Sequence, residues 1–217
     1  NMNFMFLNED FVNLLDDFVN PFRENFPFSP CLCTFSTDGD LPEHAKYFQS
    51  EEANELRFFI SMFFNLPSYT GMGYETKALK PTKYEEFSHE FVKYQQNPFL
   101  WGENEELFEA VSDIRDLYLK YSPVIDSYCL KLLERPTDRV LIWGYEAKNE
   151  PEILCIANMD NEITNFPIKF AAAKNRTARL VYTNSRYEEI HEILEFSDGK
   201  AFVQNIYIGE CAVYEFV

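Results

Sequence analysis

The chain has 217 residues, of which 46% are hydrophobic and 17% aromatic, and a formal net charge of −17. This length fits one or two domains, and the supply of core-forming side chains excludes an intrinsically disordered protein. So much negative charge repels phosphate groups, and we therefore expect no nucleic-acid partner and no docking on anionic membranes. A neutral substrate such as a sugar is compatible with this charge.

The N-terminal region has no basic segment followed by an apolar run, and the longest apolar runs are too short to span a bilayer. We therefore expect a soluble, cytoplasmic protein. Among the five cysteines, Cys31 and Cys33 would share one face of a predicted strand, while the three histidines are widely scattered. The cysteines are interpreted as small buried thiols, and we expect no metal site and no cofactor.

The first 125 residues alternate between helical and strand patterns. The predicted elements are a helix at Glu9–Val19, a strand at Phe28–Phe35, a helix beginning after a cap at Ser50, a strand at Pro67–Thr70 and a helix from a cap at Asn104 to Tyr121. Pro123 is expected to mark the end of the last helix. The apolar stripe predicted for the second helix is Leu56, Phe59, Ile60 and Phe63, and that predicted for the third is Leu107, Val111, Ile114 and Tyr118.

Beyond Ile125 the pattern changes to short β-rich runs separated by turn residues. These runs are Tyr128–Leu133, Val140–Tyr145, Ile153–Ala157, Phe166–Phe170, Ala178–Tyr182, Ile190–Phe196, Ala201–Ile206 and Ala212–Val217. Many short strands in such a length are typical of an antiparallel all-β sandwich. The sequence therefore predicts two domains, at residues 1–125 and 126–217.

Acidic residues follow both strands predicted in the first domain. Asp38 and Asp40 come after the first strand, and Glu75 comes after the second within Gly73-Tyr74-Glu75. In a parallel α/β barrel, functional side chains lie at the carboxyl ends of the strands, where the loops converge. For a single acidic turn, a solvated loop or a helix cap is the more usual explanation.

The ordered series of segments resembles the C-terminal part of glycoside hydrolase family 13, the α-amylase family. Phe35 to Asp40 is similar to the short segment at the end of the family's seventh barrel strand, whose last residue is an essential Asp. Gly73-Tyr74-Glu75 is similar to the segment at the end of the eighth strand. Lys93-Tyr94 and the downstream Trp101 look like donor-sugar residues of the maltosyltransferases that use maltose 1-phosphate, the closest likeness within the family. Val140–Trp143 and Ile153–Asn158 look like the opening strands of the family's C-terminal sandwich.

The resemblance implies a fold consisting of the last two strand–helix units of a (β/α)8 barrel followed by an antiparallel β-sandwich. It also implies a catalytic role for Asp40 and substrate-binding roles for Asp38, Glu75, Lys93, Tyr94 and Trp101. The sequence departs from the commonest family wording, Asn-His-Asp, because it reads Asp38-Gly39-Asp40. The choice between Asp38 and Asp40 as the essential acid therefore stays open, although the maltosyltransferases also lack that His.

The resemblance places the nucleophile and the general acid of the reaction on middle strands of the barrel, upstream of Asn1. A full barrel takes roughly 250 residues. We therefore expect a part of a retaining glycoside hydrolase or maltosyltransferase that acts on α-1,4-glucans or maltooligosaccharides and is inactive alone. Its partner would be the remainder of the barrel, and exposed strand edges would also permit a homo-oligomer.

The alternative is a noncatalytic carbohydrate-binding or protein-interaction module with the β-sandwich as its working part. An exposed row of aromatic side chains would favour that function, and Trp143 and Tyr145 are the candidates. Because they lie two apart in a β run, they share one face of the strand, which could equally face the core.

Overall fold

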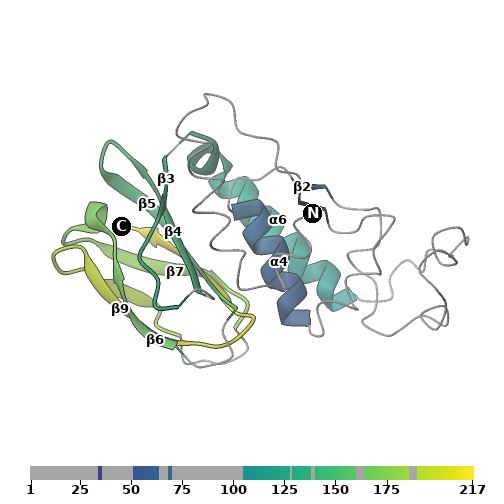
Figure 1. Ribbon diagram of the computed structural model, residues 1–217. Coiled ribbons are helices and arrows are strands. Elements are labelled where there is room, and N and C mark those ends of the chain that lie inside the picture. The colour runs from purple at the N-terminus through teal and green to yellow at the C-terminus, as the bar shows by residue number, and fades with distance from the viewer. Residues whose placement is uncertain are drawn as a thin grey trace, which may run out of the picture.

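A computed structural model describes residues 34–35, 51–63, 68–69, 105–127, 129–137, 140–159, 164–185 and 190–217. Figure 1 shows two helices placed between a β-rich region and a short strand pair. The helix predicted at Glu9–Val19 lies outside the described residues. No helix in the described ranges is long and apolar enough to cross a membrane.

The two short strands predicted in the first half pair with each other. Strand β1 (Thr34–Phe35) runs parallel to β2 (Ser68–Tyr69), with Thr34 opposite Ser68 and Phe35 opposite Tyr69. Helix α4 (Glu51–Phe63) lies between them in the sequence. The order strand, helix, strand with parallel pairing is that of a βαβ unit, so the predicted parallel pair is confirmed.

Helix α4 buries the apolar stripe that the sequence predicts. Leu56, Phe59, Ile60 and Phe63 are each at most 4% exposed and belong to a single hydrophobic cluster. Their spacing places them on one side of the helix, because residues three and four apart are neighbours on its surface. The cluster also contains residues of helix α6 (Glu105–Ser127) and of the β-rich region.

Helix α6 continues through Pro123, so the prediction that this proline ends the helix is wrong. Proline has no N–H group and would leave the carbonyl of Leu119 without its usual helical partner. The Ser122 hydroxyl donates a hydrogen bond to that carbonyl at 3.1 Å. A local side-chain bond therefore compensates for the missing backbone donor, and the helix extends to Ser127.

The second half is built of antiparallel strands, as predicted, and each of the eight predicted runs contains or overlaps a strand. The strands are β3 (Cys129–Leu132), β4 (Val140–Ala147), β5 (Glu150–Asn158), β6 (Thr164–Lys169), β7 (Thr177–Thr183), β8 (Ile193–Glu195), β9 (Lys200–Ile206) and β10 (Cys211–Phe216). A short 3-10 turn, η3 (Ala171–Ala173), follows β6. One sheet has the order β3-β4-β5-β10-β7-β8, and β6 and β9 form a second, two-stranded sheet.

The central strands of the six-stranded sheet are buried on both faces. Leu141 and Trp143 of β4 join the cluster that contains the helices, whereas Val140 and Ile142 join a second cluster with residues of β6 and β9. Successive strand side chains point to opposite faces, which explains this alternation. The sheet is therefore a middle layer, with α4 and α6 on one side and β6 and β9 on the other (Figure 1).

Candidate functional site

The predicted site lies beyond the ends of β1 and β2. Because these strands are parallel and in register, the segments that follow Phe35 and Tyr69 start from the same edge of the pair. This is the relation that a site at the carboxyl ends of barrel strands requires. The predicted site residues themselves lie outside the described residues: Asp38, Asp40, Glu75, Lys93, Tyr94 and Trp101.

The end of α4 that leads toward β2 is held by two aromatic side chains of β4. Trp143 Nε1 donates a hydrogen bond to the carbonyl oxygen of Phe63 at 2.9 Å, and the Tyr145 hydroxyl donates to the same oxygen at 2.7 Å. Phe63 is the last residue of α4, where a helix carbonyl has no partner within the helix. We call these two hydrogen bonds the Phe63 clamp.

The Phe63 clamp shows that Trp143 and Tyr145 face the core, an orientation that the sequence left open. Trp143 and Tyr145 are both 0% exposed, and the Trp143 ring packs against Phe59 with the ring centroids 5.6 Å apart. Neither side chain is available to stack on a sugar. The two aromatic residues on which a sugar-binding module would depend instead fasten the helical layer to the sheet.

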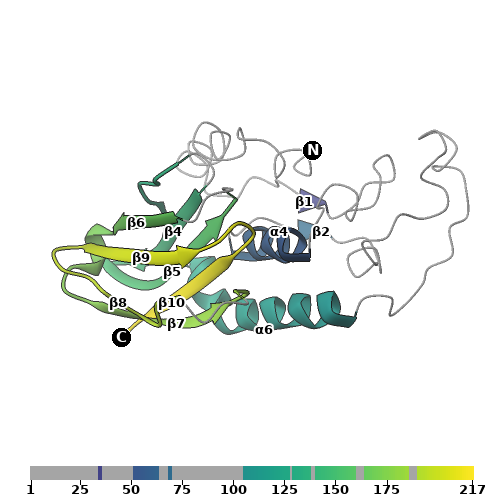
Figure 2. The same ribbon diagram turned by 90° about the horizontal axis from the view of Figure 1, so that it is seen from below.

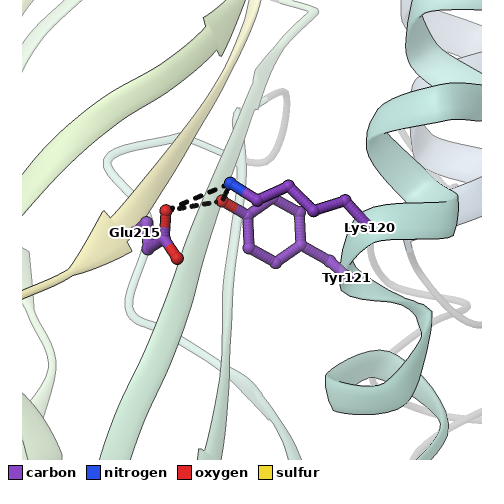
Figure 3. Close-up of polar contacts among 3 residues, drawn as sticks. All are labelled: Lys120, Tyr121 and Glu215. Atoms are coloured by element: carbon purple, nitrogen blue, oxygen red, sulfur yellow. Dashed lines mark hydrogen bonds and ion pairs between the residues drawn. The ribbon is translucent and has the colours of Figure 1, made fainter.

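A second polar contact joins the layers at Lys120, Tyr121 and Glu215 (Figure 3). The Tyr121 hydroxyl donates to Glu215 Oε2 at 2.8 Å, and Lys120 Nζ lies 2.7 Å from the Tyr121 hydroxyl oxygen and 3.3 Å from Glu215 Oε2. Burial raises the pKa of Tyr121, and the hydrogen bond to Tyr121 raises the pKa of Lys120. The hydrogen bonds connect α6 to β10.

This cluster does not have the composition of a glycosidase centre. Retaining glycosidases use two carboxyl groups about 5 to 5.5 Å apart, whereas this cluster contains a single carboxylate. Lys120 and Glu215 are also 57% and 39% exposed, and exposed ion pairs contribute little to stability. We therefore assign the contact to the packing of α6 on the sheet.

The carboxylate of Glu210 is buried in the turn that joins β9 to β10. It is 3% exposed, and it accepts hydrogen bonds from the Ser185 hydroxyl at 2.7 Å and from the Tyr207 backbone N–H at 2.8 Å. Each carboxylate oxygen thus has a donor. A buried charge with these partners stabilises the turn and explains the burial without any ligand.

The structure describes the side chains of Cys155 and Cys211, and both are buried free thiols, as predicted for them. Burial raises the pKa of Cys155 and of Cys211 well above the ordinary value. Within the described ranges, no group of three or more His, Cys, Asp or Glu side chains could hold a metal ion. Cys31 and Cys33 lie outside the described residues.

No protein-family model and no curated protein sequence matches the chain. Solved structures do match it. An α-amylase from Anoxybacillus aligns over 99% of this chain with a TM-score of 0.70 and 12% identity. The α-amylase of Geobacillus thermoleovorans, in a complex with acarbose, aligns over 94% with a TM-score of 0.69 and 11% identity. A debranching enzyme from Nostoc punctiforme aligns over 84% with a TM-score of 0.59 and 11% identity.

The chain shares the fold of part of an α-amylase. It spans 44%, 43% and 35% of the lengths of the three matched chains, respectively. At these identities the likeness concerns the fold alone. The antiparallel strands and the helices before them therefore have the arrangement found within less than half of these larger enzymes.

Proposed function

We propose that this chain is part of an α-amylase-family enzyme that acts on α-1,4-glucans. Residues 1–125 would supply the last two strand–helix units of its catalytic barrel, and residues 126–217 its C-terminal β-sandwich. The observation that carries the proposal is the fold match, which extends over 94% and 99% of this chain in two α-amylases. The order of elements is consistent with this proposal. Among the described residues, β1, α4, β2 and α6 come first, and all strand pairings after α6 are antiparallel.

The chemistry assigned to this part of the enzyme is support of the transition state. A retaining mechanism needs a nucleophile and a general acid, and by the family resemblance both belong to barrel strands outside this chain. Asp40 would hydrogen-bond sugar hydroxyls and stabilise the positive charge that develops on the sugar ring. The parallel register of β1 and β2 supports placing Asp40 and Glu75 near one mouth.

The substrate would be an α-glucan or a maltooligosaccharide. The acarbose complex of the Geobacillus α-amylase supports this class of ligand, because acarbose is what that similar structure binds. Asp38, Lys93, Tyr94 and Trp101 would contact the sugar. If the reaction is transfer from maltose 1-phosphate rather than hydrolysis, Lys93 and Tyr94 would hold the donor. The alternative function, a noncatalytic carbohydrate-binding module, depended on Trp143 and Tyr145 as exposed aromatic side chains, and both are buried in the core.

Kinetics of the extended polypeptide, meaning this chain together with the sequence encoded upstream of Asn1, test the proposal. Asp40→Asn should lower kcat by about 100- to 1000-fold, which corresponds to about 3 to 4 kcal/mol, while KM changes little. Lys93→Ala and Tyr94→Ala should chiefly raise KM, because the sugar is held in both ground state and transition state.

Asp38→Asn is the matched comparison, since Asp38 lies in the same segment and its change alters the charge equally, but as a proposed sugar contact Asp38 should affect KM and not kcat. It should leave kcat near the wild-type value. Loss of turnover in Asp38→Asn with normal turnover in Asp40→Asn would show that the essential acid is Asp38. Normal turnover in both variants would contradict the assignment of this phrase to the site.

A further inference from the structure

The Phe63 clamp lies close in the sequence to one strand of the proposed barrel. Both hydrogen bonds of the clamp end on the carbonyl of Phe63, the last residue of α4, and β2 begins five residues later at Ser68. A connection of this length spans at most about 18 Å. Figure 2 shows α4 extending from the β-rich region toward the β1–β2 pair. The position of Phe63 therefore limits where β2 can begin.

The donors of the clamp come from a strand that is itself held on both sides. Strand β4 pairs with β3 and with β5, and Trp143 lies opposite Leu132 on the first and opposite Cys155 on the second. Trp143 and Tyr145 are both fully buried, so neither side chain can turn away without opening the core. A carbonyl oxygen has two lone pairs, and two donors in fixed positions therefore determine where the Phe63 carbonyl lies.

The side chain of Phe63 is fixed as well as its carbonyl. Its ring is buried, stacks on the Phe59 ring with the centroids 4.9 Å apart, and meets the Tyr118 ring of α6 edge-on at 6.3 Å. The end of α4 is thereby held by the sheet through its backbone and by both helices through its ring. Loss of the clamp would leave the ring contacts in place and release the carbonyl. It would therefore shift the exit of the chain toward β2 without unfolding the helix.

We propose that Trp143 and Tyr145 are positioning residues for the proposed glucan site. This inference rests on the proposed function. By fixing the carbonyl at the exit of α4, they would set the position of β2 and, through it, that of Glu75, to which the family resemblance gives a substrate-binding role. Glu75 follows the last residue of β2 by six positions. Neither aromatic side chain would touch the substrate, because both are buried. Displacement of a substrate-positioning group by about 1 Å can cost about 100-fold in rate, even when the mutation lies far from the chemistry.

Kinetics of the extended polypeptide separate positioning from stability. Loss of folded protein lowers the apparent kcat and leaves KM unchanged, because the remaining molecules are normal, whereas displacement of a sugar contact raises KM. We expect Tyr145→Phe to raise KM for an α-glucan about 3- to 10-fold, with kcat within about twofold of the wild type. Tyr214→Phe is the matched control, because it removes the donor to the His191 carbonyl from a ring packed in the other cluster. It should leave KM unchanged.

A double-variant cycle tests the route through Glu75. In a Glu75→Gln background, Tyr145→Phe should raise KM no further, because the contact that it displaces is already lost. An unchanged KM in Tyr145→Phe, an equal rise in Tyr214→Phe, or an equal rise in the Glu75→Gln background would each overturn the inference. All three outcomes leave the proposed function standing.

If the wild-type extended polypeptide does not act on glucan, the proposed function fails. The hold of the clamp on β2 is then decided in this chain alone, by amide hydrogen exchange of the peptide that contains Ser68 and Tyr69. Faster exchange of this peptide in Tyr145→Phe than in Tyr214→Phe supports the hold on β2. Equal exchange in the two variants overturns it.

Discussion

Removing the Tyr145 hydroxyl should weaken the attachment of α4 to the sheet by a predictable amount. Tyr145→Phe removes one of the two donors to the Phe63 carbonyl, and the Trp143 donor at 2.9 Å remains. The carbonyl is therefore not left unpaired. The expected loss in the free energy of unfolding is that of one neutral hydrogen bond, about 1 kcal/mol. Trp143→Phe removes a donor and part of a buried ring, so its loss should be larger, about 2 to 3 kcal/mol.

Urea unfolding measures the loss, and amide hydrogen exchange locates it. Tyr214→Phe is the matched control, because the Tyr214 hydroxyl donates to the His191 carbonyl at 2.9 Å and its ring packs in the other cluster, with β6 and β9. Both Tyr→Phe variants should lose similar stability. Only Tyr145→Phe should accelerate exchange in α4 beyond the change in global stability. Equal exchange of α4 in the two variants would refute the idea that the Phe63 clamp holds this helix.

Two further predictions concern the sheet. Gly144→Ala should cost about 1 to 3 kcal/mol in urea unfolding, because an added Cβ would lie 2.6 Å from the buried Phe170 ring; an unchanged midpoint would contradict this. For Cys155 and Cys211, the stability contributed by the protonated thiols is present below the ordinary pKa of 9.0 and is lost as pH rises through the raised pKa. The wild type should therefore lose more stability between pH 8 and pH 10 than a double alanine variant, and parallel pH profiles would contradict the burial argument.

The local signals in the sequence were sufficient for most elements. Ser50 followed by acidic residues and a helical apolar stripe predicted α4, and β-rich runs between turn residues predicted the strands. The prediction that Pro123 ends the helix was wrong because the effect of a proline depends on whether another donor reaches the carbonyl that it leaves unpaired, here that of Leu119. The hydroxyl of Ser122 does so here, and a single local pattern does not reveal that bond.

The tertiary placement of side chains was harder to predict from the sequence than the secondary structure. A run such as Val140–Tyr145 fits a strand covered on one face or on both, so the sequence left the orientation of Trp143 and Tyr145 open. The helix end at Phe63 that both side chains contact lies about 80 residues earlier in the chain. The Phe63 clamp could therefore not be predicted from local pattern, and the acids proposed for the site, Asp38, Asp40 and Glu75, lie outside the described residues.

The most direct test of the central claim is the rate of product release from starch and from maltose 1-phosphate with an α-glucan acceptor, measured for the purified chain alone and for the extended polypeptide. The account predicts no turnover by the chain alone, because the nucleophile and the general acid are assigned to strands outside it. It predicts turnover by the extended polypeptide on at least one of the two substrates. Turnover by the chain alone that persists through purification and disappears in Asp40→Asn would contradict the account.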